Sequence, residues 1–424
     1  MAHIVHVCPR YAPALGGVEL FFSKISEHLA ERGHRVSVWT TDAASVRAFT
    51  TPSGAPLRPL QETIRGVEVR RFPVRYLPAH KYVRTAAHWL PFGTRWKCET
   101  LRWTPWAPAL TRASASPSVP VDLVHVAGLP YSSVLFAGAR LAQRARAPLV
   151  ISPFTHVPPP GALARSMRRA YLSPLNIALM AQADRLFVQS EHEARVLEAA
   201  GLSAIPRPVV GMGVDAADCT GGDRRRFRHA HGLPDSAVVV GHLANKSRDK
   251  GTLDLLDAME TLWDRGEQTW LVLAGAEMRS FSERWPRVRH RERVVNLGVL
   301  SEADRRDFFA AIDVFALPSY VESFGISPLE AAINRVPVVT YAHGGPAHVF
   351  RDNVNARLVR VGDIPELADA IFRLASAEAA RQQFGDEGRR LAQKYSWARV
   401  FDVVSGEYDA LLARRQSSSN AAGT

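Results

Sequence analysis

The sequence predicts an α/β protein with two Rossmann-like domains, each a doubly wound parallel sheet, and three observations support this prediction. The chain has 424 residues, more than one hydrophobic core normally serves. Short apolar runs alternate with amphipathic helical patterns along most of it. The alternation restarts near residue 238, so the second half repeats the architecture of the first. Because open parallel sheets bind ligands at the carboxyl ends of their strands, we expect the two domains to face each other across a cleft.

The first half opens with a βαβ pattern. An apolar run at residues 4–7 is followed by a loop ending in Gly16 and Gly17, a helix at about 18–31 and a strand at 36–40. Such a crossover makes the two strands parallel. Further strands are predicted at residues 123–126, 149–152 and 185–188.

The second half contains five more predicted strands, at residues 238–241, 270–274, 294–297, 314–317 and 337–340. Prolines and glycines cluster at residues 206–213 and mark the boundary between the halves. We therefore expect domains at 1–208 and 209–395, a C-terminal helix at 396–413 and a disordered tail at 414–424. The tail is serine-rich and has no large apolar residue.

Composition excludes several classes of protein. The first residues lack a basic lead and a long apolar segment, and no apolar run approaches the roughly 18 residues of a membrane-spanning helix, so we expect a cytoplasmic protein. Cys8, Cys98 and Cys219 are odd in number and widely spaced. They predict neither a disulfide framework nor a zinc site.

The formal net charge of +12 comes entirely from the first half. Residues 1–200 contain 24 Lys and Arg against 12 Asp and Glu, while residues 201–424 contain 29 of each. A basic half favours an acidic partner. Since no nucleic-acid-binding motif is present, we expect an anionic membrane surface or a phosphate-bearing acceptor rather than nucleic acid.

Residues 76–112 interrupt the α/β pattern with aromatic and basic residues. Four of the nine tryptophans lie between residues 89 and 106, among them Trp96 and Trp103. Aromatic rings with basic neighbours suit a membrane interface or an amphiphilic acceptor, which predicts peripheral association with the inner face of the cell membrane. The alternative is a helical insertion whose tryptophans pack on the core of their own domain.

The most specific motif is Pro-Ser-Tyr-Val-Glu-Ser-Phe-Gly-Ile-Ser-Pro-Leu-Glu-Ala-Ala at residues 318–332, which follows a predicted strand. Ser327 and Pro328 predict the start of a helix, with Ser327 as its N-cap. Backbone amides at a helix start bind anions such as a diphosphate. Glu322 and Glu330 place two carboxylates at the same cleft, where they can bind sugar and ribose hydroxyls.

This motif resembles the retaining glycosyltransferases of family 4, which have two Rossmann-like domains in the GT-B fold. Their hallmark is two glutamates separated by seven residues, matched here by Glu322 and Glu330. The resemblance implies that Glu322 contacts the donor hexose and supports the reacting centre, and that Glu330 binds the ribose hydroxyls. It assigns the donor diphosphate to the segment formed by Ser323, Phe324, Gly325 and Ile326.

Other segments resemble the family in the same order. Gly16 and Gly17 resemble its first glycine-rich loop, and the segment from His242 to Gly251 resembles its phosphate-binding Arg…Lys-Gly element. In that element Lys250 would neutralise the leaving diphosphate. His156 stands where family members often place an active-site histidine. The final helix from Ser396 resembles the one that packs back on the first domain.

The chain departs from the family pattern at two places. His242 replaces an arginine, so that Lys246 or Arg248 would supply the missing charge, and His348 replaces a glutamate after Gly344-Gly345. The resemblance implies transfer of a hexose from a UDP-sugar or GDP-sugar to an acceptor hydroxyl, with retention. The aromatic and basic segment favours a glycan or lipid-linked acceptor in cell-envelope or exopolysaccharide synthesis, and a soluble small-molecule acceptor is the alternative. The resemblance implies no further cofactor, and the absence of an Asp-x-Asp triplet predicts no metal site.

Three other classes compete with this interpretation. A nucleotide-binding dehydrogenase requires Gly-x-Gly-x-x-Gly after a strand, a spacing that the first glycine loop lacks. A non-catalytic glycan or lipid binder would have no need for Glu322, Glu330 and Lys250. A glycoside hydrolase needs paired carboxylates that flank the scissile bond, which nothing in the sequence suggests.

Overall fold

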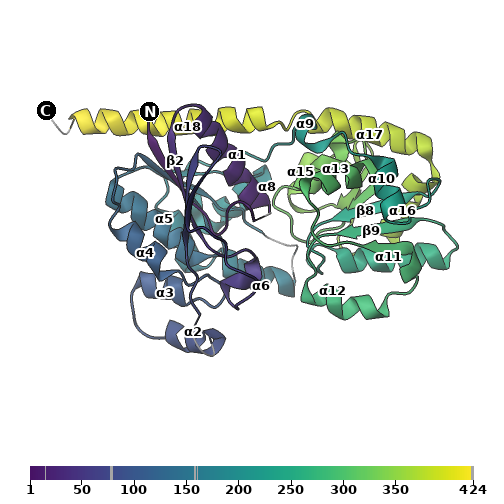
Figure 1. Ribbon diagram of the computed structural model, residues 1–424, viewed down its shortest axis with the longest axis horizontal. Helices are drawn as coiled ribbons and strands as arrows, with labels where there is room; N and C mark the ends of the chain where they lie inside the picture. The colour runs from purple at the N-terminus through teal and green to yellow at the C-terminus, as the bar shows by residue number, and fades with distance from the viewer. Residues whose placement is uncertain (15, 77–79, 157–158, 160, 422–424) are drawn as a thin grey trace. The chain divides into compact units, whose positions relative to one another are not determined.

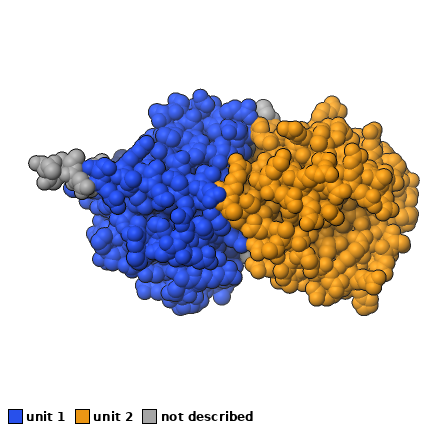
Figure 2. Space-filling view, turned by 90° about the horizontal axis from the view of Figure 1, so that it is seen from above, with its two compact units in different colours: residues 1–155, 165–210, 400–424 blue, residues 156–164, 211–399 orange. Residues whose placement is uncertain are grey.

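The computed structural model describes residues 1–14, 16–76, 80–156, 159 and 161–421. They form two compact units, coloured separately in Figure 2. Unit 1 comprises residues 1–155, 165–210 and 400–424, and unit 2 comprises residues 156–164 and 211–399. The main boundary therefore lies two residues beyond the predicted one, and the short segment 156–164 belongs to unit 2 although it follows a strand of unit 1.

Unit 1 is built on a seven-stranded sheet with the order β3-β4-β2-β1-β5-β6-β7. All neighbours are parallel except β3 and β4. Its strands are β1 His3–Val7, β2 Arg35–Thr41, β3 Gln61–Ile64, β4 Val67–Phe72, β5 Leu123–Ala127, β6 Leu149–Ser152 and β7 Arg185–Leu186. The predicted α/β fold class is confirmed, because five of the parallel strands, β1, β2, β5, β6 and β7, lie where the apolar runs predict them.

The antiparallel pair β3 and β4 has no counterpart in the prediction. Arg65 and Gly66 connect the two strands with φ values of 46° and 79°, the left-handed conformation of a tight hairpin turn. Only alternate residues of β4 are buried at its start, and Glu68 between them is exposed. The edge hairpin therefore lacks the continuous apolar run that identified the parallel strands.

Helices of unit 1 cover the sheet and extend beyond it (Figure 1). They are α1 Gly17–Glu31, η1 Val46–Phe49, α2 His80–His88, α3 Thr94–Thr100, α4 Pro108–Ala115, α5 Ser132–Ala145, α7 Pro174–Met180, α8 Glu191–Leu197, η2 Glu198–Leu202 and most of α6 Ala162–Tyr171 and α18 Trp397–Ala421. Within the described residues, no helix is both long and apolar enough to cross a membrane.

Helix α18, drawn in yellow in Figure 1, packs on unit 1 through a buried polar network. The Tyr408 hydroxyl is hydrogen-bonded to His6 Nε2 (3.2 Å) and His125 Nδ1 (2.5 Å). The other ring nitrogens of these histidines bond Ser26 and Ser152. Burial lowers the pKa of His6 to about 3, so this network is neutral.

The same helix corrects the prediction for the C-terminus. It continues to Ala421, whereas the sequence predicts a helix to 413 and a disordered tail from 414; residues 422–424 lie outside the described residues. Arg415 donates to the carbonyls of Val121 and Ala145 and to the Asp122 carboxylate. These contacts hold a helical turn that its serine-rich composition alone does not predict.

Unit 2 is built on a six-stranded parallel sheet with the order β10-β9-β8-β11-β12-β13. The strands are β8 Val239–Leu243, β9 Trp270–Ala274, β10 Val294–Asn296, β11 Val314–Leu317, β12 Val338–Tyr341 and β13 Ala356–Val359. The helices are α9 Ala216–Cys219, α10 Arg224–Ala230, α11 Thr252–Asp264, α12 Arg279–Arg284, η3 Trp285–Arg287, η4 Arg291–Arg293, α13 Glu302–Ala311, α14 Ile326–Ile333, α15 Gly344–Val349, α16 Ile364–Ser376 and α17 Glu378–Ala392. All five strands predicted for the second half are present, and β13 is an additional one.

Candidate functional site

The candidate site of unit 2 lies where the strand order of its sheet changes direction. Strand β8 lies between β9 and β11, so the chain winds one way from β8 to β10 and the other way from β11 to β13. Lys250 lies in the loop after β8, and Glu322 lies in the loop after β11. Both loops leave the carboxyl ends of adjacent strands, the position at which doubly wound sheets bind ligands.

Lys250 and Glu322 form a partly buried ion pair. The Lys250 ammonium donates to Glu322 Oε2 at 3.0 Å and to the Val321 carbonyl at 2.8 Å. The two side chains are 19% and 16% exposed. The sequence prediction that these residues share a site therefore agrees with the geometry, and both groups remain accessible to a ligand.

Backbone contacts fix the two loops against each other. The Asp249 carbonyl accepts from the Tyr320 amide (2.9 Å) and the Ser319 hydroxyl (3.2 Å). Gly251 has a φ of 69°, and a Cβ there would lie 1.7 Å from the Pro318 carbonyl oxygen. Only glycine allows so close an approach in this conformation. These contacts fix the loop that carries Lys250 against the loop that carries Glu322.

Charge keeps Glu322 ionised despite its burial. Burial raises the pKa of Glu322, but the charge and hydrogen bond of Lys250, together with the Phe324 amide, outweigh it, so the pKa lies below its ordinary value. Burial together with Lys250 lowers the pKa of His156 to about 4. His156 is therefore a neutral imidazole within electrostatic reach of the Lys250–Glu322 pair.

The segment Ser323, Phe324, Gly325 and Ile326 leads from Glu322 into helix α14. Gly325 has a φ of 98° and caps the helix without a side-chain bond, so the predicted N-cap role of Ser327 is wrong. The left-handed turn places the helix start two residues earlier, at Ile326. The first amides of α14 have no intrahelical acceptor, which favours an anion at this end.

Glu330 lies one turn into α14, as predicted, and its side chain is 7% exposed. Its Oε2 forms an ion pair with Arg305 of α13, and its Oε1 lies 4.0 Å from the Cys219 sulfur. Sequence reasoning missed both neighbours, because they lie 25 and 111 positions away and belong to no motif. The ion pair with Arg305 nevertheless fixes the side chain of Glu330, the second glutamate of the motif.

His242 does not occupy the position of a donor-binding group. It is completely buried within β8. Its Nδ1 is hydrogen-bonded to the Ala316 carbonyl (2.8 Å) and its Nε2 to the Thr252 hydroxyl (2.9 Å). Burial lowers its pKa to about 4. The predicted donor contact is therefore replaced by a supporting role, in which His242 ties β8 to β11 and to the start of α11.

Lys246 likewise does not supply the missing positive charge. Its side chain is 1% exposed, and its ammonium group donates to Glu277, Asn296 and the Leu297 carbonyl. An ammonium group has three donors, so these bonds use all of them. Arg248 is exposed, and its charge lowers the pKa of Tyr320 against the larger effect of burial. Of the two predicted cations, Arg248 is the accessible one.

Gly16 and Gly17 lie in unit 1, at the start of α1. Behind them Arg10 forms a buried ion pair with Glu19 (2.7 Å), with side chains 13% and 7% exposed. Burial raises the pKa of Glu19. Gly17 has open space where a Cβ would stand, in keeping with a loop that a ligand can approach.

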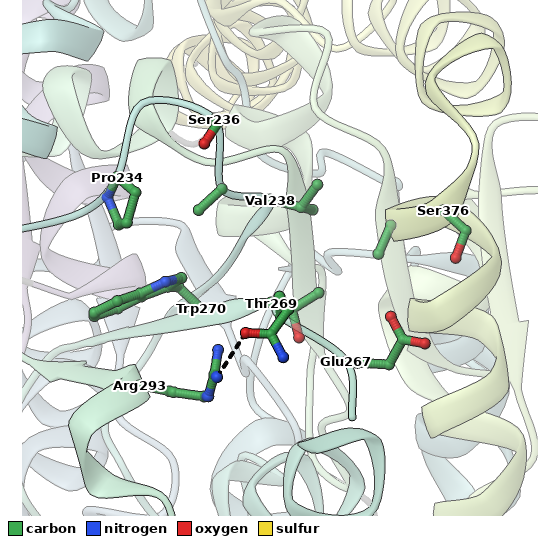
Figure 3. A pocket seen from close by; sticks show the side chains of 11 residues that line it. Pro234, Ser236, Val238, Glu267, Thr269, Trp270, Arg293 and Ser376 are labelled. Carbon is green, nitrogen blue, oxygen red and sulfur yellow. Dashed lines mark hydrogen bonds between the residues drawn. The ribbon is translucent and has the colours of Figure 1, made fainter. Parts of the chain in front are cut away.

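A separate surface cavity in unit 2 lies at the other end of the strands of the same sheet (Figure 3). It measures about 370 Å³ and is lined in part by Val238, Thr269 and Arg293. These three residues directly precede β8, β9 and β10. The cavity therefore borders the amino ends of the strands and is distinct from the site around Lys250 and Glu322.

Two family models match the chain, one on each half. Residues 16–213 match the glycosyl transferase 4-like domain, and residues 223–391 match the glycosyl transferases group 1. The second match contains the Lys250, Glu322 and Glu330 segments described above.

Curated proteins with related sequences include D-inositol 3-phosphate glycosyltransferases. The one from Mycolicibacterium gilvum is 32% identical over 240 residues, covering 55% of this chain and 53% of that protein. The one from Saccharomonospora viridis is 33% identical over 250 residues, covering 55% and 57%. The chain thus spans about half the length of the curated relatives it matches.

Solved structures share the fold over nearly the whole chain. The sucrose-phosphate synthase of Thermosynechococcus elongatus has a TM-score of 0.77 at 21% identity, covering 98% of this chain and 100% of that one. HepE of Anabaena, in complex with UDP-glucose, has a TM-score of 0.72 at 19% identity, covering 97% and 100%. The two family models and this shared fold confirm the resemblance seen in the sequence: the chain belongs to the family 4 glycosyltransferases and has the two α/β domains of the GT-B fold.

Proposed function

We propose that the protein is a retaining glycosyltransferase that moves a hexose from a UDP-sugar or GDP-sugar to an acceptor hydroxyl. The observation that carries the proposal is the pairing of Lys250 with Glu322 at the direction change of a doubly wound sheet, with Glu330 on the following helix. The three groups provide a cation for a diphosphate and two carboxylates for hydroxyl groups. A dehydrogenase has no need for this combination, and a glycoside hydrolase, which uses two carboxylates, has no need for a cation that binds a diphosphate.

Each group has a defined part in the proposed reaction. Lys250 and the first amides of α14 bind the diphosphate, Glu322 binds the hexose, and Glu330 binds the ribose diol. The acceptor oxygen forms a bond to the anomeric carbon on the face from which the diphosphate leaves, and its proton passes to the departing phosphate oxygen. Lys250 stabilises the charge that develops on that phosphate, which is why we propose a reaction without a divalent metal ion.

For the acceptor we propose a lipid-linked glycan of the cell envelope or an exopolysaccharide, bound by unit 1. The excess of basic residues in the first half supports an acceptor that carries phosphate. The curated relatives named for D-inositol 3-phosphate support the alternative, a soluble phosphorylated acceptor. Both acceptors would reach the protein in the cytoplasm.

A thermal-shift series tests the donor. Wild type and Glu330→Gln are melted with UDP, GDP, ADP, UDP-glucose, GDP-mannose and NAD. A ligand at 100 times its Kd stabilises by about 2.7 kcal/mol, which raises Tm measurably. We expect one uridine or guanosine nucleotide and its sugar to stabilise wild type, and the shift to be lost in Glu330→Gln.

Glu302→Gln is the matched control, because Glu302 is exposed in the first turn of α13 in the same unit. It should keep the full shift. Stabilisation by NAD alone would favour a dehydrogenase, and no stabilisation by any nucleotide would favour a non-catalytic binder.

We also propose that α2 and α3 of unit 1 contact an anionic membrane. Tyr82, Trp89 and Phe92 are 77%, 82% and 53% exposed, and Val83 and Leu90 are 43% and 46% exposed. We call these five residues the α2–α3 patch. Residues 76–112 contain six Lys and Arg but one acid, Glu99, which Arg95 neutralises. Arg84 is buried and donates to backbone carbonyls, but Arg95, Lys97, Arg102 and Arg112 are exposed. Exposed rings with exposed cations in the same segment suit a headgroup region.

The tryptophans that belong to this patch differ from those highlighted by the sequence. Trp96 and Trp103 are half-buried, and their indole nitrogens donate to the carbonyls of Ala87 and Pro130. They stabilise the insertion, as the alternative interpretation predicts, while Trp89 and Phe92 face solvent. Residues 77–79 of this segment lie outside the described residues.

A further inference from the structure

Arg305 contacts Glu330 but belongs to none of the motifs found in the sequence. It lies on α13, before β11, while Glu330 lies on α14, after β11. The guanidinium Nη2 bonds Glu330 Oε2 directly. Arg305 is 33% exposed and Glu330 only 7%, so the ion pair reaches from the surface into the buried site.

The two oxygens of the Glu330 carboxylate have unequal surroundings. Oε2 bonds Arg305, whereas Oε1 faces the Cys219 sulfur at 4.0 Å. A thiol is a weak hydrogen-bond donor, so Oε1 keeps most of its capacity to accept. Asn334 donates to the carbonyls of Cys219 and Glu330, which fixes this wall of the site.

Arg305 also favours the charged form of the carboxylate, although the pKa of Glu330 stays above its ordinary value. Burial raises the pKa of Glu330, and Arg305 opposes this effect. Without a counter-charge, a buried carboxylate takes up a proton at a higher pH. The protonated group would be a weaker acceptor for hydroxyl groups, because charge-assisted hydrogen bonds are about twice as strong as neutral ones.

We propose that Arg305 is a positioning residue for the donor nucleotide: it holds Glu330 ionised, with Oε2 turned toward α13 and Oε1 available to the ribose diol. The proposal rests on the proposed function, in which Glu330 binds ribose. It assigns a role to an arginine outside the two-glutamate motif and predicts that recognition of ribose, but not of the diphosphate, depends on it.

Isothermal titration with UDP, GDP and inorganic pyrophosphate between pH 6 and 8.5 tests the proposal on wild type, Arg305→Met and Arg305→Lys. For the nucleotide that binds, we expect Arg305→Met to raise Kd at least about tenfold relative to wild type. The ratio of the two Kd values should grow as pH falls, because Glu330 of the variant then takes up a proton. Arg305→Lys should restore most of the affinity, and the Kd of pyrophosphate should not change.

Arg306→Met is the matched control, because Arg306 is the next residue on α13 and is similarly half-exposed. It should bind as wild type does. Unchanged nucleotide affinity in Arg305→Met, a pH-independent ratio, or equal loss of nucleotide and pyrophosphate binding would each overturn the positioning role. If wild type itself binds neither UDP nor GDP, the proposed function fails and this inference falls with it.

Discussion

Glu193 is a buried carboxylate whose charge depends on pH near neutrality. It lies in the first turn of α8 with 2% of its surface exposed. Its oxygens accept the amides of Gln189 (2.7 Å) and Thr155, and Ser190 caps the same turn. Burial outweighs these bonds and raises the pKa of Glu193 to about 7. This carboxylate thus links α8 to the residue that precedes His156.

The raised pKa predicts a pH-dependent difference in stability between wild type and Glu193→Gln. The folded state holds the proton up to about pH 7, whereas the unfolded chain releases it near the ordinary value of 4.5. Stability from this group is complete below about pH 4.5 and is lost as pH rises to about 7. The free energy of unfolding of Glu193→Gln should therefore rise relative to wild type by up to about 3 kcal/mol between pH 5 and 8.

Urea titrations followed by tryptophan fluorescence at pH 5, 6, 7 and 8 measure this difference. Glu191→Gln on the same helix, at an exposed position, should keep a constant offset from wild type. A constant offset for Glu193→Gln as well would mean that the carboxyl group has an ordinary pKa.

Residue by residue, the sequence predicted the polar groups that belong to a motif better than those that support it. Glu322, Glu330 and Lys250 could be found because their spacing resembles a family. The same resemblance placed His242 and Lys246 in the site. Both side chains are buried, however, and their polar atoms are already hydrogen-bonded within the protein. Arg305 could not be found, since a contact between two helices leaves no signature in local spacing.

At the scale of the elements, the loop from β8 to α11 depends on Gly251. Its left-handed φ of 69° and its approach to the Pro318 carbonyl make separate demands, one on backbone conformation and one on space. Gly232, after α10, has a similar φ of 64° but open space around it. A comparison of the two glycines therefore distinguishes the cost of the left-handed conformation, which both share, from the cost of the steric clash, which only Gly251 has.

We expect Gly251→Ala to destabilise unit 2 far more than Gly232→Ala. Both variants pay roughly 1–2 kcal/mol for a left-handed alanine. Gly251→Ala must also push the Pro318 loop away, which should bring its total to about 3 kcal/mol or more. Chemical denaturation measures both, and equal losses would show that the loop yields without cost. Nucleotide binding should weaken only in Gly251→Ala, because Lys250 and Glu322 move with the loop.

Elements with two buried faces were predicted well from the sequence. Strands of the parallel sheets read as continuous apolar runs, and β6, β9 and β11 begin and end where the pattern places them. The hairpin β3–β4 and the edge strand β13 were not predicted. Each lies at the edge of its sheet, where half-exposed residues break the apolar run.

At the scale of the whole molecule, the α2–α3 patch predicts how the chain distributes between water and lipid. Sedimentation with vesicles should show binding to a mixture of phosphatidylglycerol and phosphatidylcholine, and much weaker binding to phosphatidylcholine alone. Salt should weaken the binding, since exposed charges are screened. Replacing Trp89 and Phe92 together by Ser should reduce the affinity at least about tenfold.

Val299→Ser is the control for this experiment, because Val299 is a 61% exposed apolar residue of unit 2. It should bind vesicles as wild type does. If the double variant binds as well as wild type, or if neutral vesicles bind equally, lipid is not the partner of the patch and a soluble acceptor becomes the leading proposal.

The docking of α18 has a consequence for synthesis on the ribosome. Unit 1 contains residues 1–155 together with residues 400–421, and Tyr408 supplies the hydroxyl that His6 and His125 share. Domains usually fold in the order in which they are translated. Here the first unit acquires its last buried contacts only after every residue of the second has been made. The seven strands of unit 1 end at residue 186, so its sheet lacks the cover of α18 while residues 211–399 are translated.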